Sequence, residues 1–245
     1  MSQTEENFLH RTRLLLGNEA VERLQKSRVL IAGIGGGAVY AAEALARGGI
    51  GSLTVYDPDR VHISNINRQI LALHKDCSRC KTDILRERLQ EINPALELNA
   101  FAEAMTLENI GRIVQNGSFD YIVDAIDPVN EKCCLLAAAV QHNIPVISAM
   151  GAGCRLDPAQ VKYADISKTY NCRLARSVRA RLKKEYGITG GIRCVFSAEP
   201  PLPEAVTKND DGSLCIGSSS FMPGIFGLFM AAEVLRKLSR AREIL

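Results

Sequence analysis

A set of acidic and basic residues in the first half of the chain has the composition that a polyphosphate site requires. It consists of Asp57, Asp59, Arg68, Lys81, Asp124 and Asp127. Cations balance the charge of phosphate groups, and a carboxylate can hold Mg²⁺. A hydride-transfer site needs no such balance. Solvated surface charges and helix caps would account for any one of these residues, but they account poorly for the whole set.

A glycine-rich turn precedes this set. The segment Gly33-Ile34-Gly35-Gly36-Gly37-Ala38 follows a short apolar run at 28–32 and opens an alanine-rich stretch at 38–47. It fits the pattern G-x-G-x-x-G/A between a strand and a helix, which is typical of nucleotide binding. Gly33 is predicted to make the tight turn, and Gly35 to let the backbone approach a phosphate. The N-terminus of the helix then offers free N–H groups to an anion.

Strand and helix patterns alternate along most of the chain. Predicted strands span 28–32, 52–56, 96–101, 119–123 and 145–149, and predicted helices span 12–25, 38–47, 82–92, 107–114 and 129–142. This alternation predicts an α/β fold with a Rossmann-like, mostly parallel sheet flanked by helices. Ligands of such sheets lie beyond the carboxyl ends of the strands. Both acid pairs follow predicted strands, so we expect them at that edge, with Asp57 at the ribose.

The rhythm changes after residue 153, where a C-terminal extension is predicted to add strands at 161–166 and 192–197 and helices at 173–186 and 221–239. Residues 197–217 are predicted to form a long loop, which is usually functional or disordered. We expect a single domain over residues 1–245. It divides into an N-terminal helical arm at 1–26, a nucleotide-binding half at 27–153 and a substrate-binding half at 154–245.

The bulk composition is that of an ordinary soluble protein. Of 245 residues, 47% are hydrophobic and 23% charged, and the net charge of +3 is too small to indicate nucleic-acid binding by itself. The N-terminus has no signal-peptide pattern, and the most apolar stretch, 221–235, contains Glu233 and is short for a membrane span. We therefore expect a cytoplasmic protein that is not embedded in a membrane, with its eight cysteines reduced.

These motifs together resemble those of the ubiquitin-activating-enzyme-like superfamily, which includes ThiF, MoeB and HesA. The resemblance covers essentially the whole chain and involves Gly33, Gly35, Gly36, Asp57, Asp59, Asn65, Arg68, Gln69, Lys81 and Asp127. It implies that these residues bind ATP. It also implies that Asp57 holds the ribose, that Arg68 and Lys81 bind phosphates, and that Asp127 binds Mg²⁺ or stabilises the reacting phosphate.

The resemblance further implies a homodimer in which an arginine from the N-terminal arm enters the partner's site. Arg11 is the matching position and is the predicted catalytic residue of the arm. The common family pattern has another arginine where this chain has Asn7, so Arg13 remains an alternative.

Within this superfamily, the segments at 65–70, 151–153, 157–158, 165–169 and 194–197 resemble the branch of tRNA threonylcarbamoyladenosine dehydratases. That branch implies adenylylation of the carboxylate on a modified adenosine of tRNA, followed by ring closure. It also implies a late catalytic cysteine that carries sulfur or assists the closure, and Cys215 is the nearest match. A cysteine desulfurase or another sulfur-transfer protein then becomes a candidate partner.

Three other functions remain open. The first is activation of a ubiquitin-like sulfur-carrier protein, whose enzymes usually have two C-x-x-C pairs for zinc. This chain has one such pair, Cys77 with Cys80, which counts against that function. The second is a nicotinamide-dependent oxidoreductase, which the combination of Arg68, Lys81 and Asp127 disfavours. The third is a non-catalytic relative that binds tRNA or protein.

A run of basic residues bears on the choice of substrate. Arg173, Arg176, Arg179 and Lys183 are spaced by three or four residues, so they are predicted to share one face of the helix at 173–186. A cationic stripe suits the phosphate backbone of RNA. A solvated helix face is the simpler alternative.

Overall fold

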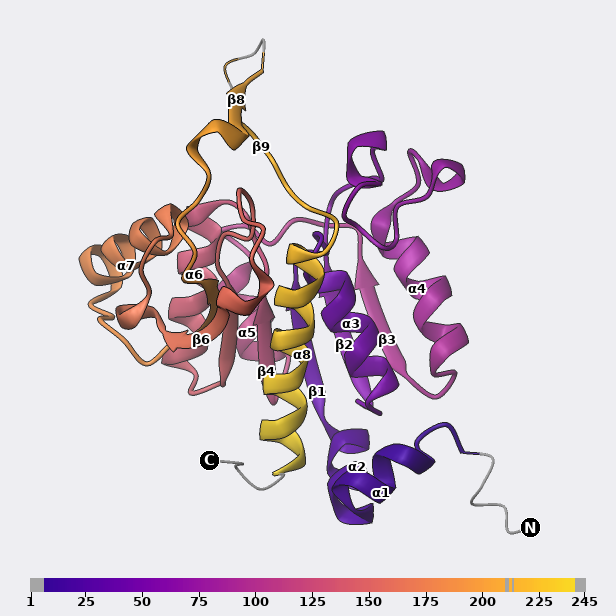
Figure 1. Ribbon diagram of the computed structural model, residues 1–245. Helices are drawn as coiled ribbons and strands as arrows, with labels where there is room; N and C mark the ends of the chain where they lie inside the picture. The colour runs from indigo at the N-terminus through magenta and orange to yellow at the C-terminus, as the bar shows by residue number, and fades with distance from the viewer. Residues whose placement is uncertain (1–6, 210–211, 213, 241–245) are drawn as a thin grey trace.

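The computed structural model describes residues 7–209, 212 and 214–240. Within these residues one seven-stranded sheet runs in the order β3-β2-β1-β4-β5-β7-β6 (Figure 1). The strands are β1 (Arg28–Ala32), β2 (Ser52–Tyr56), β3 (Glu97–Phe101), β4 (Tyr121–Asp124), β5 (Val146–Ala149), β6 (Val161–Asp165) and β7 (Arg193–Ser197). Every neighbouring pair is parallel except β6 with β7. The predicted fold class is therefore confirmed.

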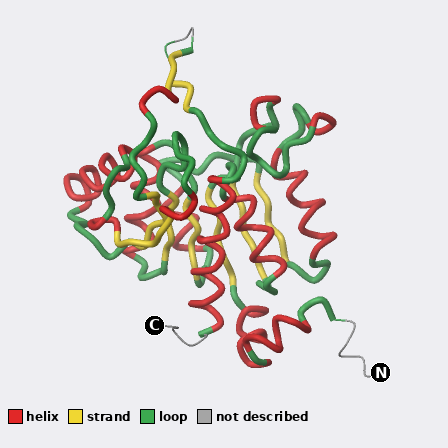
Figure 2. The backbone as a smooth tube through the Cα atoms, viewed as in Figure 1, coloured by secondary structure: helices red, strands yellow, loops and turns green. Residues whose placement is uncertain are grey.

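Helices lie on both faces of the sheet (Figure 2). On one face, α3 (Ala38–Arg47), α4 (Lys81–Ile92) and α8 (Met222–Ser239) enclose one apolar core. On the other, α5 (Ile110–Asn116), α6 (Val129–Gln141) and α7 (Arg173–Tyr186) enclose a second. The central strands are covered on both sides, which explains why β1 reads as an unbroken apolar run rather than an alternating one.

The N-terminal helix predicted at 12–25 is two helices, α1 (His10–Leu16) and α2 (Asn18–Lys26). They are separated by Gly17, which has a φ of 87°. Glycine adopts a positive φ without a steric penalty and ends the first helix there. Residues 1–6 of the predicted arm lie outside the described residues.

The long loop predicted at 197–217 was also wrong in part. It contains a short 3₁₀ turn at Pro203–Ala205 and two paired strands, β8 (Val206–Lys208) and β9 (Leu214–Ile216). These strands are too short to show a period-2 pattern, so the sequence did not reveal them. The resulting hairpin stands above the carboxyl end of the main sheet (Figure 1).

Other predicted boundaries differ from the structure by a few residues. The helix predicted at 107–114 begins at Ile110, because the Asn109 side chain accepts a hydrogen bond from the Thr106 N–H at 2.8 Å and forms a turn first. Among the described residues, no helix combines the length and apolar character needed to cross a membrane.

Candidate active site

The strand order reverses between β1 and β4, and this reversal creates a crevice at their carboxyl ends. In open parallel sheets this is the place where ligands bind. A cavity of about 480 Å³ occupies it. The structure brings all the predicted cofactor-binding residues except Gly36 to its wall: Gly33, Gly35, Asp57, Asp59, Asn65, Arg68, Gln69, Lys81 and Asp127.

The glycine turn is shaped by its neighbours. Gly33 has a φ of 84°, and a Cβ there would lie 2.8 Å from the Ala125 carbonyl oxygen, so a larger residue would be both strained and crowded. A Cβ on Gly35 would meet no atom within 4 Å, which leaves this backbone open to a ligand. A Cβ on Gly36 would lie 2.9 Å from the Cβ of Pro223, so Gly36 permits the close packing of α8 and does not line the cavity.

Asp57 fastens this turn to the end of β2. It is 5% exposed, and its carboxylate accepts hydrogen bonds from the N–H of Ile34 at 2.6 Å and the N–H of Asp59 at 2.9 Å. Burial raises the pKa of Asp57, although the charge of Lys81 and the two backbone N–H groups oppose that rise. The carboxylate thus organises the turn before any ligand binds.

Lys81 is the first residue of α4 and is 4% exposed. Its Nζ lies 2.7 Å from a carboxylate oxygen of Asp59 and 3.7 Å from one of Asp57. A cation is unfavourable at a helix N-terminus, so the two acids compensate for both the helix dipole and the burial. The ammonium group is therefore held at the cavity wall by carboxylates.

Arg68 belongs to a polar turn that follows the short 3₁₀ segment Ile63–Asn65. Its Nη1 donates to the carbonyl of Ser64 at 2.8 Å and to Oδ1 of Asn67 at 2.9 Å. Asn65 stabilises the same turn by accepting the N–H of His62 at 3.0 Å. Gln69 is 6% exposed and its N–H donates to the carbonyl of Asn65.

The two acids after β4 have different surroundings. Asp127 is exposed on the cavity wall, and its carboxylate makes no ion pair with a described residue. Asp124 was expected at the same edge but is fully buried below it. Its carboxylate lies 2.8 Å from Nζ of Lys132 and accepts the hydroxyl of Ser148. It therefore stabilises the interior and does not face the cavity.

Sequence reasoning missed several residues of the cavity wall. Glu131 lies in the first turn of α6, and Tyr56 stacks on Phe101 with ring centroids 4.7 Å apart. Thr106 lies in the loop after β3. The spacing of Asp127 and Glu131 across one helical turn was a signal for Glu131. The cavity thus has four carboxylates and two cations on its wall, so an anionic ligand there needs further positive charge.

Comparison with known proteins gives a consistent family. The model of the ThiF family matches residues 9–245. The chain belongs to the ThiF family. It is 37% identical over 244 residues to tRNA threonylcarbamoyladenosine dehydratase of Bacillus subtilis, covering 96% of this chain and 95% of that protein. The predicted resemblance to the superfamily is confirmed.

A solved structure has the same architecture. It is the Escherichia coli tRNA N6-threonylcarbamoyladenosine dehydratase, TcdA, in complex with ATP, with a TM-score of 0.88 and 32% identity, covering 98% of this chain and 96% of that one. An adenylyltransferase and sulfurtransferase of Drosophila willistoni is 31% identical over 227 residues, covering 91% of this chain but 43% of that protein.

In this ThiF-family chain the predicted arm arginine lies far from the cavity of its own chain. Arg11 is in α1, at the end of the domain opposite the hairpin (Figure 1). Leu9, at the start of α1, packs against Gly49 just before β2, where a Cβ would lie 3.0 Å from Leu9 Cδ1. Arg13 lies in the same helix and contacts Gln25 at 3.4 Å.

Cys215 also lies away from the cavity wall. It is exposed on β9 and pairs with Thr207 of β8. All eight cysteines are free thiols, and burial raises the pKa of Cys133 to about 11. Cys215 is thus more accessible than Cys133, which lies in the core.

The basic face of α7 is narrower than predicted. Arg173, Arg176 and Lys183 are exposed. Arg179 is half-buried, and its Nη1 donates to the carbonyl of Thr169 at 2.9 Å and to that of Ile166. Arg179 lies next to the buried side of α7, so its guanidinium is turned partly toward the protein, while the other three predicted RNA-binding cations face outward.

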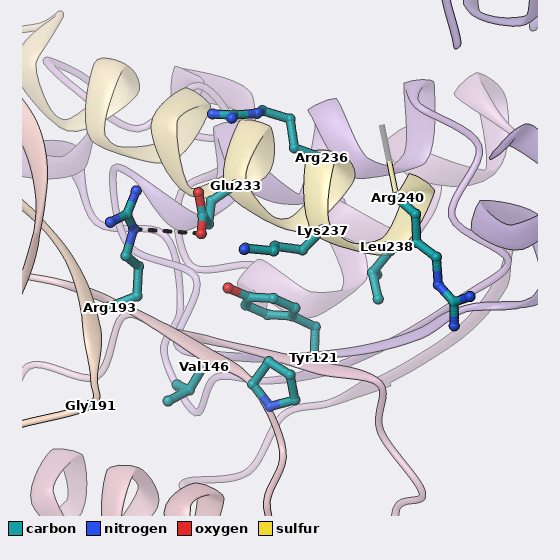
Figure 3. A pocket seen from close by; sticks show the side chains of 10 residues that line it. Tyr121, Val146, Gly191, Arg193, Glu233, Arg236, Lys237, Leu238 and Arg240 are labelled. Atoms are coloured by element: carbon teal, nitrogen blue, oxygen red, sulfur yellow. Dashed lines mark ion pairs between the residues drawn. The ribbon is translucent and has the colours of Figure 1, made fainter. Parts of the chain in front are cut away.

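A larger cavity, of about 810 Å³, lies at the amino ends of the strands (Figure 3). Arg193 of β7 pairs with buried Glu233 of α8 at 3.5 Å and lies 4.7 Å from the centre of the Tyr163 ring. The other cations on its wall lie at or just beyond the last turn of α8, where positive charge stabilises a helix C-terminus. They are Arg236, Lys237 and Arg240. Local packing and the helix dipole account for this cavity's charges.

Proposed function

We propose that this chain is an ATP-dependent dehydratase that adenylylates the carboxylate of threonylcarbamoyladenosine in tRNA and then cyclises it. The observation that carries the proposal is the gathering of the glycine turn, Arg68, Lys81 and Asp127 around one cavity at the β1–β4 crevice. The names of the B. subtilis and E. coli relatives and the ATP in the E. coli structure support this substrate pair.

The proposed chemistry has two steps. A carboxylate oxygen of the modified adenosine attacks the α-phosphorus of ATP, the bond to the β-phosphate oxygen breaks, and pyrophosphate leaves. An oxygen within the same modified side chain then attacks the activated carbonyl carbon, the ring closes and AMP leaves. AMP is the leaving group that a free carboxylate lacks. The protein's contribution is to position the reactants and to stabilise the developing charge.

The predicted cofactor-binding residues of the wall have proposed roles in ATP binding. Gly35 and the N-terminus of α3 offer backbone N–H groups to phosphate. Arg68 and Lys81 bind the phosphate oxygens, which requires Lys81 to share its charge between ATP and Asp59. Asp57 supports the ribose side of the site, while Asn65 and Gln69 maintain the turn that carries Arg68.

Mg²⁺ is the proposed companion of ATP. Asp127 would hold it, because its exposed carboxylate lines the cavity and makes no ion pair with a described residue. Carboxylate oxygens are preferred Mg²⁺ ligands. The bound ion would supply positive charge to a wall that carries more carboxylates than cations.

The same shortage of positive charge supports a homodimer in which Arg11 acts in the partner's site. The helix that carries Arg11, α1, lies at the end of the domain opposite the hairpin, so an active-site role for Arg11 requires the site of a second copy. Leu14 and Leu15, beside it on α1, are 75% and 82% exposed, as expected for a helix that docks on another chain. The test mixes Arg11→Ala with Asp127→Asn protein. Activity absent from each alone should return in the mixed dimers, and no recovery would reject a finger in trans.

The tRNA is proposed to contact the exposed cations of α7. Neutralising Arg173, Arg176 and Lys183 together should weaken tRNA binding and reduce the slope of log affinity against log salt by about 3. Arg179 is predicted to matter for the fold of the Ile166–Lys168 turn instead. The matched control neutralises three exposed cations outside α7, namely Lys26, Lys75 and Arg112. Unchanged tRNA affinity in the α7 variant would remove this surface from the proposal.

Cys215 is proposed as a catalytic or sulfur-accepting thiol on the exposed hairpin, with a cysteine desulfurase or other sulfur-transfer protein as its partner. Cys215→Ser should leave ATP–pyrophosphate exchange intact and lower product formation. Equal product formation in Cys215→Ser and wild-type protein would exclude this role. A tRNA substrate also implies a cytoplasmic enzyme, which cell fractionation can test.

The deciding experiment is ATP–pyrophosphate exchange with purified protein. Exchange should require tRNA that carries threonylcarbamoyladenosine, should fail with unmodified tRNA, and should fall in Asp127→Ala protein. Exchange that ignores tRNA and responds to a small carrier protein with a free C-terminus would reject the dehydratase in favour of a sulfur-carrier adenylyltransferase. ATP-independent hydride transfer would reject both.

A further inference from the structure

Asn67 joins two parts of the site that are far apart in the sequence. Its Oδ1 accepts a hydrogen bond from Nη1 of Arg68 at 2.9 Å, and its Nδ2 donates to the carbonyl of Ser218 at 3.1 Å. Arg68 lines the nucleotide cavity. Ser218 belongs to the segment 217–221, which leads from the β8–β9 hairpin to α8 and which we name the strap. The exposed amide of Asn67 therefore contacts a residue of the nucleotide cavity through its oxygen and a residue of the strap through its nitrogen.

The strap is fixed to both its neighbours. At its start, the carbonyl of Gly217 accepts the N–H of Cys154 at 2.8 Å, and the N–H of Gly217 donates to the carbonyl of Ala205 at the same distance. At its end, the Ser219 hydroxyl accepts the N–H of Met222 at 3.2 Å. The next residue of α8, Pro223, packs against Gly36 of the nucleotide turn. A displacement of the hairpin base would therefore change the packing of Pro223 on the nucleotide turn and the hydrogen bond between Asn67 and Ser218.

Asn67 is not needed for the local turn. Asn65 already closes that turn through the N–H of His62, and the carbonyl of Ser64 already accepts a bond from Arg68. Asn67 is exposed, yet its amide oxygen and its amide nitrogen each have a protein partner. Here both are directed to partners that belong to opposite sides of the site.

We propose that Asn67 is a positioning residue that couples Arg68 to the strap, so that RNA bound at the hairpin and ATP bound at Arg68 favour each other. The proposal rests on the proposed function. It takes Arg68 as an ATP ligand, and it takes the hairpin, which carries Cys215, as the place where the modified adenosine of a tRNA held on α7 is processed. RNA on the hairpin holds the strap in place, the strap holds Asn67, and Asn67 holds the guanidinium toward the cavity. Linkage makes the effect reciprocal: ATP strengthens RNA binding by the same factor.

Two variants separate the two hydrogen bonds. Asn67→Asp keeps an acceptor for Arg68 but loses the donor to Ser218, and Asn67→Leu loses both. Asn99→Asp is the control for an added charge, because Asn99 is an exposed residue of β3 that lies outside the cavity wall and whose side-chain amide donates to Glu97.

The measurement is ATP affinity by calorimetry, with and without tRNA, on the full chain of each protein. In wild type, tRNA should tighten ATP binding by about threefold to tenfold, the range of one net hydrogen bond. Both Asn67 variants should reduce that factor to near one, while Asn99→Asp retains it. Hydrogen exchange gives a second readout: ATP alone should slow amide exchange in residues 214–221 of wild type and of Asn99→Asp, but not of Asn67→Asp.

The possible failures are distinguishable. Wild type that does not bind ATP overturns the proposed function and this coupling with it. Wild type that binds ATP without any effect of tRNA, or Asn67 variants that keep the wild-type factor and the wild-type protection of the strap, overturn the coupling alone.

Discussion

The two cavities at opposite ends of the sheet differ in the kind of groups that line them, and their volumes do not reflect that difference. The cavity at the amino ends is the larger, at about 810 Å³ against 480 Å³. Its cations are accounted for by one ion pair and by the C-terminus of α8. The smaller cavity joins a glycine turn, a helix N-terminus and loops from separate strands. The polarity of a parallel sheet, which directs N–H groups and loop residues to one end, identifies the site better than size does.

The buried ion pair below the nucleotide cavity offers the strongest test of this contrast. Lys132 and Asp124 have side chains 1% and 0% exposed. Lys132→Met leaves a buried, unpaired carboxylate and should cost about 3–5 kcal/mol of unfolding free energy. Arg193→Met removes the half-exposed partner of buried Glu233 in the other cavity and should cost less, about 1–2 kcal/mol, because this guanidinium is partly in solvent and lies 3.5 Å from the carboxylate. Urea unfolding measures both, and similar losses would mean that the two ends are equally dependent on charge pairing.

The next test concerns activity. Arg68→Ala should lower ATP–pyrophosphate exchange by about 10²–10³-fold, the usual effect of removing one group that stabilises transition-state charge. Arg236→Ala removes the same side chain from the wall of the larger cavity and should leave exchange within about twofold. A comparable loss in Arg236→Ala would show that the amino-end cavity takes part in the reaction.

The glycine turn gives a smaller but cleaner effect. A methyl group on Gly35 meets no protein atom within 4 Å, so Gly35→Ala should fold with near-wild-type stability. That methyl group occupies the space where a phosphate would approach, so ATP affinity should fall by about tenfold, or 1.4 kcal/mol. Calorimetry and thermal unfolding together test this. Unaltered ATP affinity would place the phosphates elsewhere on the wall.

The last test is a pH dependence beside the amino-end cavity, which appears only in strongly alkaline solution. Burial, and then the nearby charge of Glu233, raise the pKa of Tyr163 to about 12 from an ordinary 10.0. The folded chain therefore holds this proton more tightly than the unfolded chain. Its contribution to stability is complete below pH 10 and declines as the pH rises toward 12. Urea unfolding of wild type and Tyr163→Phe across this range should show a smaller decline in the variant, and parallel curves would contradict it.

Part of the site was predictable because its signals are local. Gly33, Asp57 and Asp127 follow their strands by one to three residues, and a parallel sheet carries all such positions to one edge. Asp124 was placed wrongly at the cavity. It is the last residue of β4 and is buried, whereas Asp127, three residues later, lies in the loop that forms the cavity wall. The pairing of Asp124 with Lys132 depends on the packing of α6 below β4, which no local pattern reports.

The C-terminal part shows the same limit. The helix at 173–186 was predicted from its period, yet the inward turn of Arg179 depends on carbonyl groups at Ile166 and Thr169. The β8–β9 hairpin was missed because three-residue strands carry too little pattern. The contact between Asn67 and Ser218 joins residues 151 positions apart, and the local sequence of neither segment predicts it.

The sequence by itself determined the alternation of strands and helices, the nucleotide turn, the family and most of the residues that meet in the crevice. These depend on short-range spacing and on the fixed direction of parallel strands. Only the tertiary structure decided which acid faces the cavity, that α1 with Arg11 lies at the end of the domain opposite the hairpin, and that the strap contacts Arg68 through Asn67. Those outcomes arise from contacts between distant segments, whose geometry is set by packing and not by neighbours in the chain.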